Sequence, residues 1–145
     1  MTEQLKIACD ISSTDPEAQI GLEIWIDGNQ IYNSEHVADP IAFAHEVDCA
    51  DGDHLLRFVM KNKTSAHTTI DSTGAITKDS CICIENLSFD EIKLGQIFIE
   101  NAVYQHNFNG NGDTIKDGFY GRMGCNGTVS LSFVTPIYIW LLENM

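Results

Sequence analysis

Residues Cys81–Leu94, CICIENLSFDEIKL, decide the fold because they read as a strand, a polar break and a returning strand. Successive side chains of a strand point to opposite faces. The two-residue alternation in this stretch is typical of a partly buried strand and not of a helix. We expect one face to carry Cys81, Cys83, Glu85 and Leu87, and the other to carry Ile82, Ile84, Asn86 and Ser88.

Other segments have the same period. Leu22–Asp27 alternates apolar and polar residues, and Asp27-Gly28 and Asn29 then supply the positive φ of a tight hairpin turn before Gln30–Tyr32 returns. This pattern predicts a β-hairpin. Further alternating strands are expected at Leu5–Ile11, Ile41–Val47, His54–Lys61 and Val129–Phe133.

Short strands separated by turn signals roughly every eight to twelve residues favour an all-β fold. We therefore predict an antiparallel two-sheet β-sandwich of the jelly-roll type. The chain has no internal repeat and no Pro-rich or charged linker, so residues 1–145 are expected to form a single domain.

Four segments have weaker patterns. Residues 62–80 are rich in Thr, Ser, Asp and Asn and predict a surface excursion with a small hairpin between Thr68–Ile70 and Ala75–Thr77. Gln96–Gln105 reads as a strand through Ile97, Ile99 and Val103. Asn107–Gly127 reads as a glycine-rich loop, and Ile137–Leu142 as either a strand or one helical turn.

The charge of the chain selects a class of partner. It has 8 Lys and Arg against 21 Asp and Glu, and a formal net charge of -13. Phosphate backbones and anionic lipid surfaces are repelled by such a protein. Nucleic acid and membrane are therefore not expected as partners, whereas neutral sugars, divalent cations and basic protein surfaces are compatible with this charge.

The five cysteines form an odd set without a CxxC pair, which favours reduced thiols over a disulfide framework. The N-terminal sequence MTEQLKIACD has no basic segment followed by an apolar one, so no signal peptide is expected. Synthesis in a reducing cytoplasm follows as an expectation.

Three segments together, Leu22–Asn33, His54–Thr64 and Ile84–Gly95, resemble the calcium-dependent xylan-binding family of carbohydrate-binding modules. Members of that family are jelly-roll sandwiches with a "DG" hairpin, a strand ending in Phe-x-Asn-Asp and a late Asn-Leu-x-Val-Asp-x-Ile segment. This chain has Asp27-Gly28 at the first of these motifs and Asn86-Leu87-Ser88-Phe89-Asp90-Glu91-Ile92 at the third.

The resemblance implies a glycan ligand and a Ca²⁺ cofactor, with Asn62, Asn86 and Asp90 as candidate metal ligands. Lys63 departs from the pattern, because it stands where the family has a calcium-binding aspartate and an ammonium opposes a cation. On an extended chain, Asn86 and Asp90 can share one metal only if the strand bends or ends between them.

The C-terminal segment Thr135–Asn144, TPIYIWLLEN, resembles the endings of uncharacterised proteins of marine tailed phages. This resemblance implies production in a host cytoplasm and a virion-associated accessory or decoration role. It also suggests a virion protein as partner. A separate hypothesis is self-association into a homo-oligomer through the strand face that carries Trp25 or through the run Ile137–Leu142.

The glycine-rich loop contains a second candidate calcium site. Hard cations bind several oxygen ligands, and Asn107, Asn109, Asn111 and Asp113 have the odd-position spacing of an EF-hand calcium loop, with Gly112 at its sixth position. Gly118 occupies the twelfth position, where such loops carry a glutamate. A solvated loop without metal is the alternative. A further acidic cluster, Asp48, Asp51 and Asp53, also fits an ordinary hairpin turn.

Sugar recognition needs an aromatic surface for the CH faces of the rings and a few polar groups for the hydroxyls. Trp25, on the outward face of its strand, and the adjacent Phe119 and Tyr120 are candidates, together with Tyr32 and Tyr104. The alternative for Phe119 and Tyr120 is that the glycine-rich loop folds back and uses them as a lid.

No catalytic residues are predicted. The five histidines show no zinc-binding spacing and no cysteine stands in a nucleophile motif. We therefore predict a non-catalytic β-sandwich binding module, most simply carbohydrate-binding and of phage or virion origin. A self-associating virion structural protein is the alternative, and a hydrolase is a third.

Overall fold

The computed structural model describes residues 2–64, 68–70, 72–74, 76–110 and 112–145. Its strands are β1 Thr2–Ser13, β2 Gly21–Ile26, β3 Asn29–Ser34, β4 Ile41–Ala50, β5 Gly52–Lys61, β6 Thr68–Ile70, β7 Ile76–Asp79, β8 Ile82–Phe89, β9 Ile92–Lys93, β10 Val103–His106, β11 Ile115–Gly118, β12 Arg122–Met123 and β13 Gly127–Thr135. Its helices are α1 Gln96–Asn101 and α2 Ile137–Glu143, with a 3-10 turn at Phe108–Gly110.

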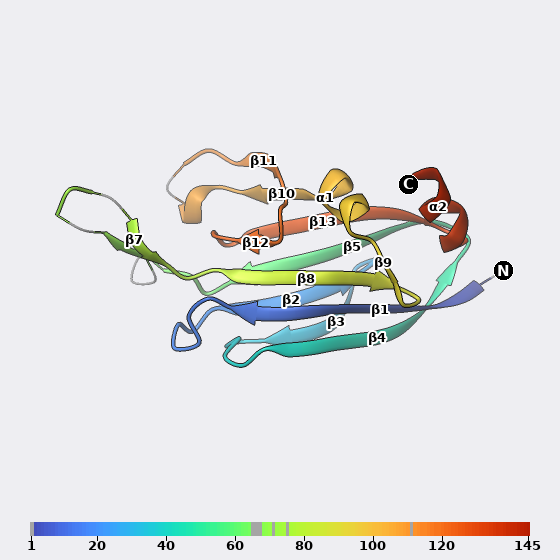
Figure 1. The fold of residues 1–145 in the computed structure, drawn as a ribbon, viewed down its shortest axis with the longest axis horizontal. Coiled ribbons are helices and arrows are strands. Elements are labelled where there is room, and N and C mark those ends of the chain that lie inside the picture. Colours follow the sequence, from blue (N-terminus) through green and yellow to red (C-terminus); the bar gives the residue numbers. More distant parts are fainter. Residues whose placement is uncertain (1, 65–67, 71, 75, 111) are drawn as a thin grey trace.

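The strands form two antiparallel main sheets that make a sandwich, as the sequence predicts (Figure 1). One sheet has the order β12-β8-β1-β4, with β9 paired to β8, and the other has the order β11-β10-β13-β5-β2-β3. The chain passes repeatedly from one sheet to the other, for example between β1 and β2 and between β4 and β5. The sheet with the order β11-β10-β13-β5-β2-β3 is called the six-stranded sheet below.

The core lies between the two sheets. Phe89 of β8 and Phe133 of β13 meet across it with ring centroids 4.9 Å apart. Along β1 and β5 every second residue is buried, which confirms the predicted alternation. Burial of these apolar side chains is the main source of stability.

The predicted hairpin at Asp27-Gly28 is confirmed. Both residues have positive φ, 48° and 83°, which matches the twist of the flanking strands β2 and β3. The small hairpin within residues 62–80 is also present as β6 and β7, and it projects from the end of the sandwich opposite α2 (Figure 1). Its second strand is Ile76–Asp79, and Ala75 lies outside the described residues.

The predicted faces of the Cys81–Leu94 stretch are wrong because β8 contains a bulge. Its pairing with β1 shifts by one residue, since Asp10 pairs with Glu85 but Ala8 pairs with Ser88. Asn86 has a φ of 55° at this point. The extra residue reverses the alternation, so that the core contains Ile82 and Ile84 before the bulge and Leu87 and Phe89 after it.

The prediction of a strand through Gln96–Gln105 is wrong in its first half. Gln96–Asn101 is the helix α1, and only Val103–His106 is a strand. The helix buries the adjacent residues Ile97 and Phe98 and leaves Ile99 exposed, whereas a strand would place Ile97 and Ile99 on one face. Phe98 packs between Phe58 and Phe119, at ring-centroid distances of 6.2 Å and 5.4 Å.

The glycine-rich segment 107–127 is more ordered than predicted, because it contributes β11 to the six-stranded sheet and β12 to the other. The C-terminal run is the helical alternative, α2, with Ile137, Trp140 and Leu141 buried against the sandwich. Among the described residues, no helix has the length and apolar character required to cross a bilayer.

All five cysteines are free thiols, and Cys125 alone of them is not buried. Burial raises the pKa of Cys9 to about 12 and that of Cys49 to about 11, with nearby carboxylates adding to the effect. Both thiols therefore stay protonated at neutral pH, which makes them poor nucleophiles and metal ligands.

Candidate functional site

The outer face of the six-stranded sheet carries a continuous row of polar and aromatic side chains. Each residue that faces away from the core lies directly opposite another on the next strand: Trp25 pairs with Arg57, and Arg57 pairs with Ser130. One row further along, Glu23 pairs with Val59, Val59 with Thr128, and Thr128 with Gln105. We call this surface the Trp25 face.

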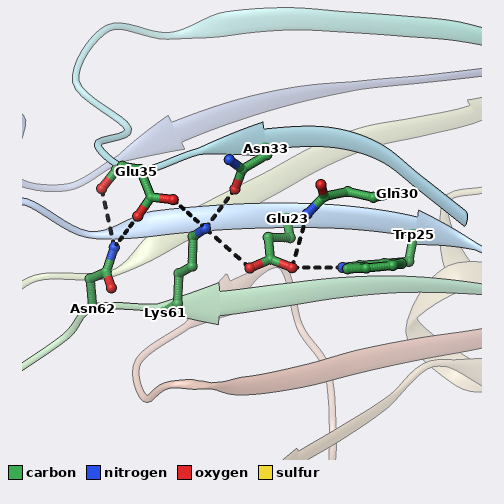
Figure 2. Close-up of polar contacts among 7 residues, drawn as sticks. All are labelled: Glu23, Trp25, Gln30, Asn33, Glu35, Lys61 and Asn62. Atoms are coloured by element: carbon green, nitrogen blue, oxygen red, sulfur yellow. Dashed lines mark hydrogen bonds and ion pairs between the residues drawn. The ribbon is translucent and has the colours of Figure 1, made fainter. Parts of the chain in front are cut away.

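The indole of Trp25 is held in place by its own strand. Its Nε1 donates a 2.8 Å hydrogen bond to Oε1 of Glu23, two residues earlier and on the same face. The same carboxylate oxygen accepts a 3.1 Å bond from Nε2 of Gln30 on β3 (Figure 2). Trp25 is half-buried, so its ring presents part of its surface to solvent in a fixed orientation.

Lys61, at the end of β5, connects Glu23, the carboxylate that binds Trp25, to a second carboxylate, Glu35. Its Nζ lies 3.1 Å from Oε2 of Glu23 and 2.8 Å from Oε1 of Glu35, and it donates a 2.5 Å bond to Oδ1 of Asn33. Figure 2 shows the ammonium between these oxygens, with residues from β2, β3 and β5 converging on it. The ammonium therefore neutralises two acidic groups that would otherwise repel each other.

These contacts shift the pKa values of all three groups. The hydrogen bond from Lys61 holds the pKa of Glu23 below its usual range, against the opposing effect of burial, and Trp25 and Gln30 add to the shift. Lys61 and then Asn62 lower the pKa of Glu35, while Glu35 and Glu23 raise the pKa of Lys61. The three groups therefore keep their charges across the neutral range.

Arg57 lies over the indole of Trp25, with its guanidinium carbon 5.8 Å from the ring centroid. On its other side is an open hollow of about 390 Å³ that reaches from β5 across β13 to β10. Gln105, Thr128 and Ser130 line this hollow with amide and hydroxyl groups. Such a combination of one aromatic ring and several hydroxyl-binding groups suits a polar ring ligand.

The predicted aromatic residues lie in different environments. Tyr32 pairs with Ile24 and meets Phe43 edge to face at 5.5 Å, so it packs on the core side of the sheet. Phe119 is 1% exposed, whereas the next residue, Tyr120, is 80% exposed. Phe119 therefore acts as a core residue beneath its loop, whereas Tyr120 is exposed and Trp25 and Tyr32 are both half-buried. Tyr104 is buried, and its hydroxyl bonds the backbone of Cys125.

Tyr120 borders a separate hollow of about 310 Å³ on the other sheet. The hollow is lined mainly by apolar groups, including Phe98 and Ile99, together with Asn86. The structure thus brings Asn86, a predicted metal ligand, near Tyr120, a predicted sugar ligand, but it places both away from Trp25.

Asn62, Asn86 and Asp90, the metal ligands implied by the family resemblance, do not converge. Asn62 donates to Oε2 of Glu35 at 3.1 Å, beside the Trp25 face. Asn86 donates to Oδ2 of Asp10 at 2.8 Å, and Oδ1 of Asp90 accepts from the Lys6 backbone N–H at 2.8 Å. Positions 6 and 10 of an extended strand are about 13 Å apart, too far for one ion to bind both groups.

Asp90 has a local structural role instead. It and Glu91 both have positive φ, and they form the two-residue turn between β8 and β9. Its carboxylate ties this turn to β1, so Asp90 fixes the hairpin that the sequence predicts.

In the loop with the second candidate calcium site, Asn111 and the side chain of Asn109 lie outside the described residues, and Asp113 is exposed. Oδ1 of Asn107 accepts the backbone N–H of Gly110 and so closes the 3-10 turn. Within the described part of the chain, no three His, Cys, Asp or Glu side chains are grouped as metal ligands would be. The loop site therefore stays a prediction.

One group of residues has the outline of a hydrolase triad. Nε2 of His54 lies 3.2 Å from Oγ1 of Thr135, and its Nδ1 lies 2.5 Å from Oδ2 of Asp27. Thr135, however, is only 2% exposed, and its hydroxyl donates to the carbonyl of Ala50 at 2.7 Å. A nucleophile must reach its substrate, so this geometry supports a structural role.

Sequence reasoning missed most of the Trp25 face. It singled out Trp25 but not Glu23, Arg57, Lys61 or Gln105. Glu23 has a recognisable signal, since it stands two residues before Trp25 and therefore on the same face. Arg57 and Gln105 have no such signal, because their proximity to Trp25 depends on which strands pair.

The sequence matches no family model and no curated protein. Two solved structures have a similar fold. The selenomethionine form of vCBM60, studied as a link between two families of calcium-dependent carbohydrate-binding modules, superposes with a TM-score of 0.56 at 10% identity over 88% of this chain and 89% of that chain. vCBM60 in complex with galactobiose gives 0.50 at 12% identity, over 87% and 96%. At these identities the likeness establishes architecture: the chain has the β-sandwich fold of these carbohydrate-binding modules, as its sequence resemblance predicts.

Proposed function

We propose that this protein is a non-catalytic carbohydrate-binding module and that its ligand lies on the Trp25 face. The fold is that of vCBM60, a carbohydrate-binding module solved in complex with galactobiose, which supports a glycan as the class of ligand. The position of the site on this chain is argued from its own residues.

The observation that carries the proposal is the hydrogen bond from Trp25 to Glu23. It orients an aromatic ring on a polar sheet face through a contact within the protein itself. In an oligosaccharide, one ring can pack its CH groups against the exposed part of the indole while hydroxyls of the following rings reach Ser130, Thr128 and Gln105 in the adjacent hollow. Because the ring is already oriented, little side-chain entropy is lost on binding.

The experiment is a glycan array followed by calorimetry and NMR with the oligosaccharides that are retained. The proposal predicts saturable binding without turnover of the sugar, and it predicts that the indole N–H signal of Trp25 shifts on titration. An array without any retained glycan would contradict the proposed function. Shifts confined to residues around Tyr120 would keep a glycan ligand but move the site to the other sheet.

The virion structural alternative has one supporting observation. Tyr138, Ile139 and Leu142 are exposed on α2, next to the buried residues of the same helix. Exposed apolar side chains in a row are typical of association surfaces. Light scattering tests self-association, and Leu142→Lys should convert any oligomer to a monomer. A virion protein as partner, phage origin and synthesis in a host cytoplasm stay predictions of the sequence.

A separate question is whether glycan binding at the Trp25 face requires calcium. The similar solved structures are described as calcium-dependent, but the described residues of this chain do not gather a set of carboxylates. On the Trp25 face, the cation between Glu23 and Glu35 is the ammonium of Lys61. We therefore propose that binding at this face does not require calcium, whether or not the 109–113 loop holds an ion.

A further inference from the structure

Arg57 occupies the centre of the Trp25 face. It lies on β5, an inner strand of the six-stranded sheet, between Trp25 of β2 and Ser130 of β13. The side chain is half-buried, because it lies over the indole on one side and borders the hollow of about 390 Å³ on the other. A cation in this position is partly removed from water.

No carboxylate neutralises this cation among the residues that the structure describes. Lys61, on the same strand, has two acidic partners. Glu23 is the acidic residue next to Trp25, but both of its oxygens are occupied, one by Trp25 and Gln30 and the other by Lys61.

The other basic residues without an acidic partner differ from Arg57 because they are exposed. Lys93, Lys116 and Arg122 also have no acidic partner in the described part of the chain. All three are exposed, so water solvates their charges fully. Arg57 combines partial burial with a polar hollow beside it, and burying an unpaired charge is costly unless a partner arrives.

We propose that Arg57 binds an anionic substituent of the glycan, so that the preferred ligand is an acidic sugar bearing a carboxylate or a sulfate ester. This inference rests on the proposed function. A guanidinium offers a planar set of N–H donors that matches two oxygens of either group. The hydroxyls and amides of Ser130, Thr128 and Gln105 would then bind the neutral hydroxyls of the same ring.

The net charge of the protein restricts this ligand further. A formal charge of -13 repels a densely charged polymer. The repulsion between separate charges fades beyond a Debye length of about 8 Å at physiological salt. A single anionic group among neutral sugars can therefore use Arg57 without suffering the repulsion felt by a polyanion.

Three small probes that differ only at C6 of the sugar test the inference: methyl β-glucoside, methyl β-glucuronide and methyl β-glucoside 6-sulfate. Each is titrated into the full chain at physiological salt, and binding is followed by NMR through the side-chain N–H signals of Arg57 and Trp25. We expect one or both anionic probes to bind about 5- to 10-fold more tightly than the glucoside, as for one exposed charge-assisted contact. The advantage should shrink as salt is added.

Two variants assign the preference to Arg57. Arg57→Gln should abolish the anionic preference, and Arg57→Lys should keep part of it, because the charge remains without the planar donor set. Arg122→Gln, which removes an exposed unpaired arginine, should leave the preference unchanged.

The outcomes separate the two proposals. If the glucuronide binds more tightly than the 6-sulfate, the preferred ligand contains a uronic acid. If the 6-sulfate binds more tightly, the preferred ligand is a sulfated sugar. Equal binding of all three probes at the Trp25 signal would overturn the anionic preference and leave the proposed function intact. Absence of shifts at Trp25 and Arg57 with every probe would overturn both the preference and the location of the site.

Discussion

The carboxylate of Asp27 and the imidazole of His54 lie 2.5 Å apart, at the point where the first hairpin turn meets the strand β5. The other ring nitrogen of His54 lies 2.6 Å from the carbonyl oxygen of Ala50. Both neighbours are hydrogen-bond acceptors, so the ring satisfies both only when each nitrogen carries a proton. The structure therefore favours the imidazolium form.

This arrangement predicts that the protein loses stability as pH rises. Burial lowers the pKa of His54, but the hydrogen bonds to Asp27 and Ala50 outweigh it, and the pKa is raised overall. A raised folded-state pKa means that the stabilisation is complete below the ordinary histidine pKa of about 6.5 and is lost as pH rises through the higher folded-state value. Urea unfolding at a series of pH values should show this decline.

His54→Gln should flatten that pH dependence. His36→Gln is the matched control, because His36 is exposed and its one hydrogen bond within the described part of the chain is to the carbonyl of Pro16, so the decline should persist in it. An unchanged slope in the His54 variant would show that another group causes the effect.

The adjacent residues Phe119 and Tyr120 should respond oppositely to truncation. Phe119→Ala removes a ring that packs against Phe98 and Tyr104, and it should lower the free energy of unfolding by about 3–5 kcal/mol. Tyr120→Ala changes an exposed side chain and should cost about 0.5 kcal/mol or less. Equal effects in thermal and urea unfolding would contradict the placement of this loop.

The hydrogen bond from Trp25 to Glu23 should matter more for binding than for stability. Glu23→Ala and Glu35→Ala each remove one ion pair of Lys61, and ion pairs that water can reach contribute little to stability. Only Glu23→Ala also removes the hydrogen-bond acceptor that orients the indole of Trp25. Calorimetry with a retained glycan should therefore show a larger loss of affinity for Glu23→Ala, and equal losses would refute the orienting role of Glu23.

Chelation should leave glycan binding at the Trp25 face unchanged. The residues of that face use Lys61 as their cation and offer no empty cluster of carboxylates. Calorimetry in EDTA and in millimolar CaCl₂ should give the same affinity. A loss of binding in EDTA would place a calcium ion in the site and would direct attention to the 109–113 loop.

Strand periodicity predicts much of this fold because it depends on local residue order. The alternation of Leu22–Asp27 locates the hairpin and puts Trp25 on the outward face, as observed. The bulge at Asn86 cannot be predicted in this way, because an asparagine within an alternating segment does not by itself indicate a positive φ. One inserted residue then reverses the faces of the rest of β8.

The helix α1 was not predicted for a different reason. Gln96–Asn101 is short, and Ile97 and Ile99 imitate a strand, but the position of Phe98 between Phe58 and Phe119 decides the conformation. The candidate site has the same difficulty. Arg57 is 32 residues from Trp25 in sequence and becomes its neighbour only through the pairing of β2 with β5.

The most direct test of the account is the affinity of Trp25→Ala for a glycan retained on the array. Because central aromatic contacts dominate binding energy, we predict a loss of about 10-fold or more in calorimetry, with the cooperative unfolding transition retained. Tyr120→Ala and Tyr138→Ala, which truncate exposed tyrosines on other surfaces, should bind as the parent does. Full affinity in Trp25→Ala, or a comparable loss in Tyr120→Ala, would contradict the assignment of the Trp25 face as the glycan site.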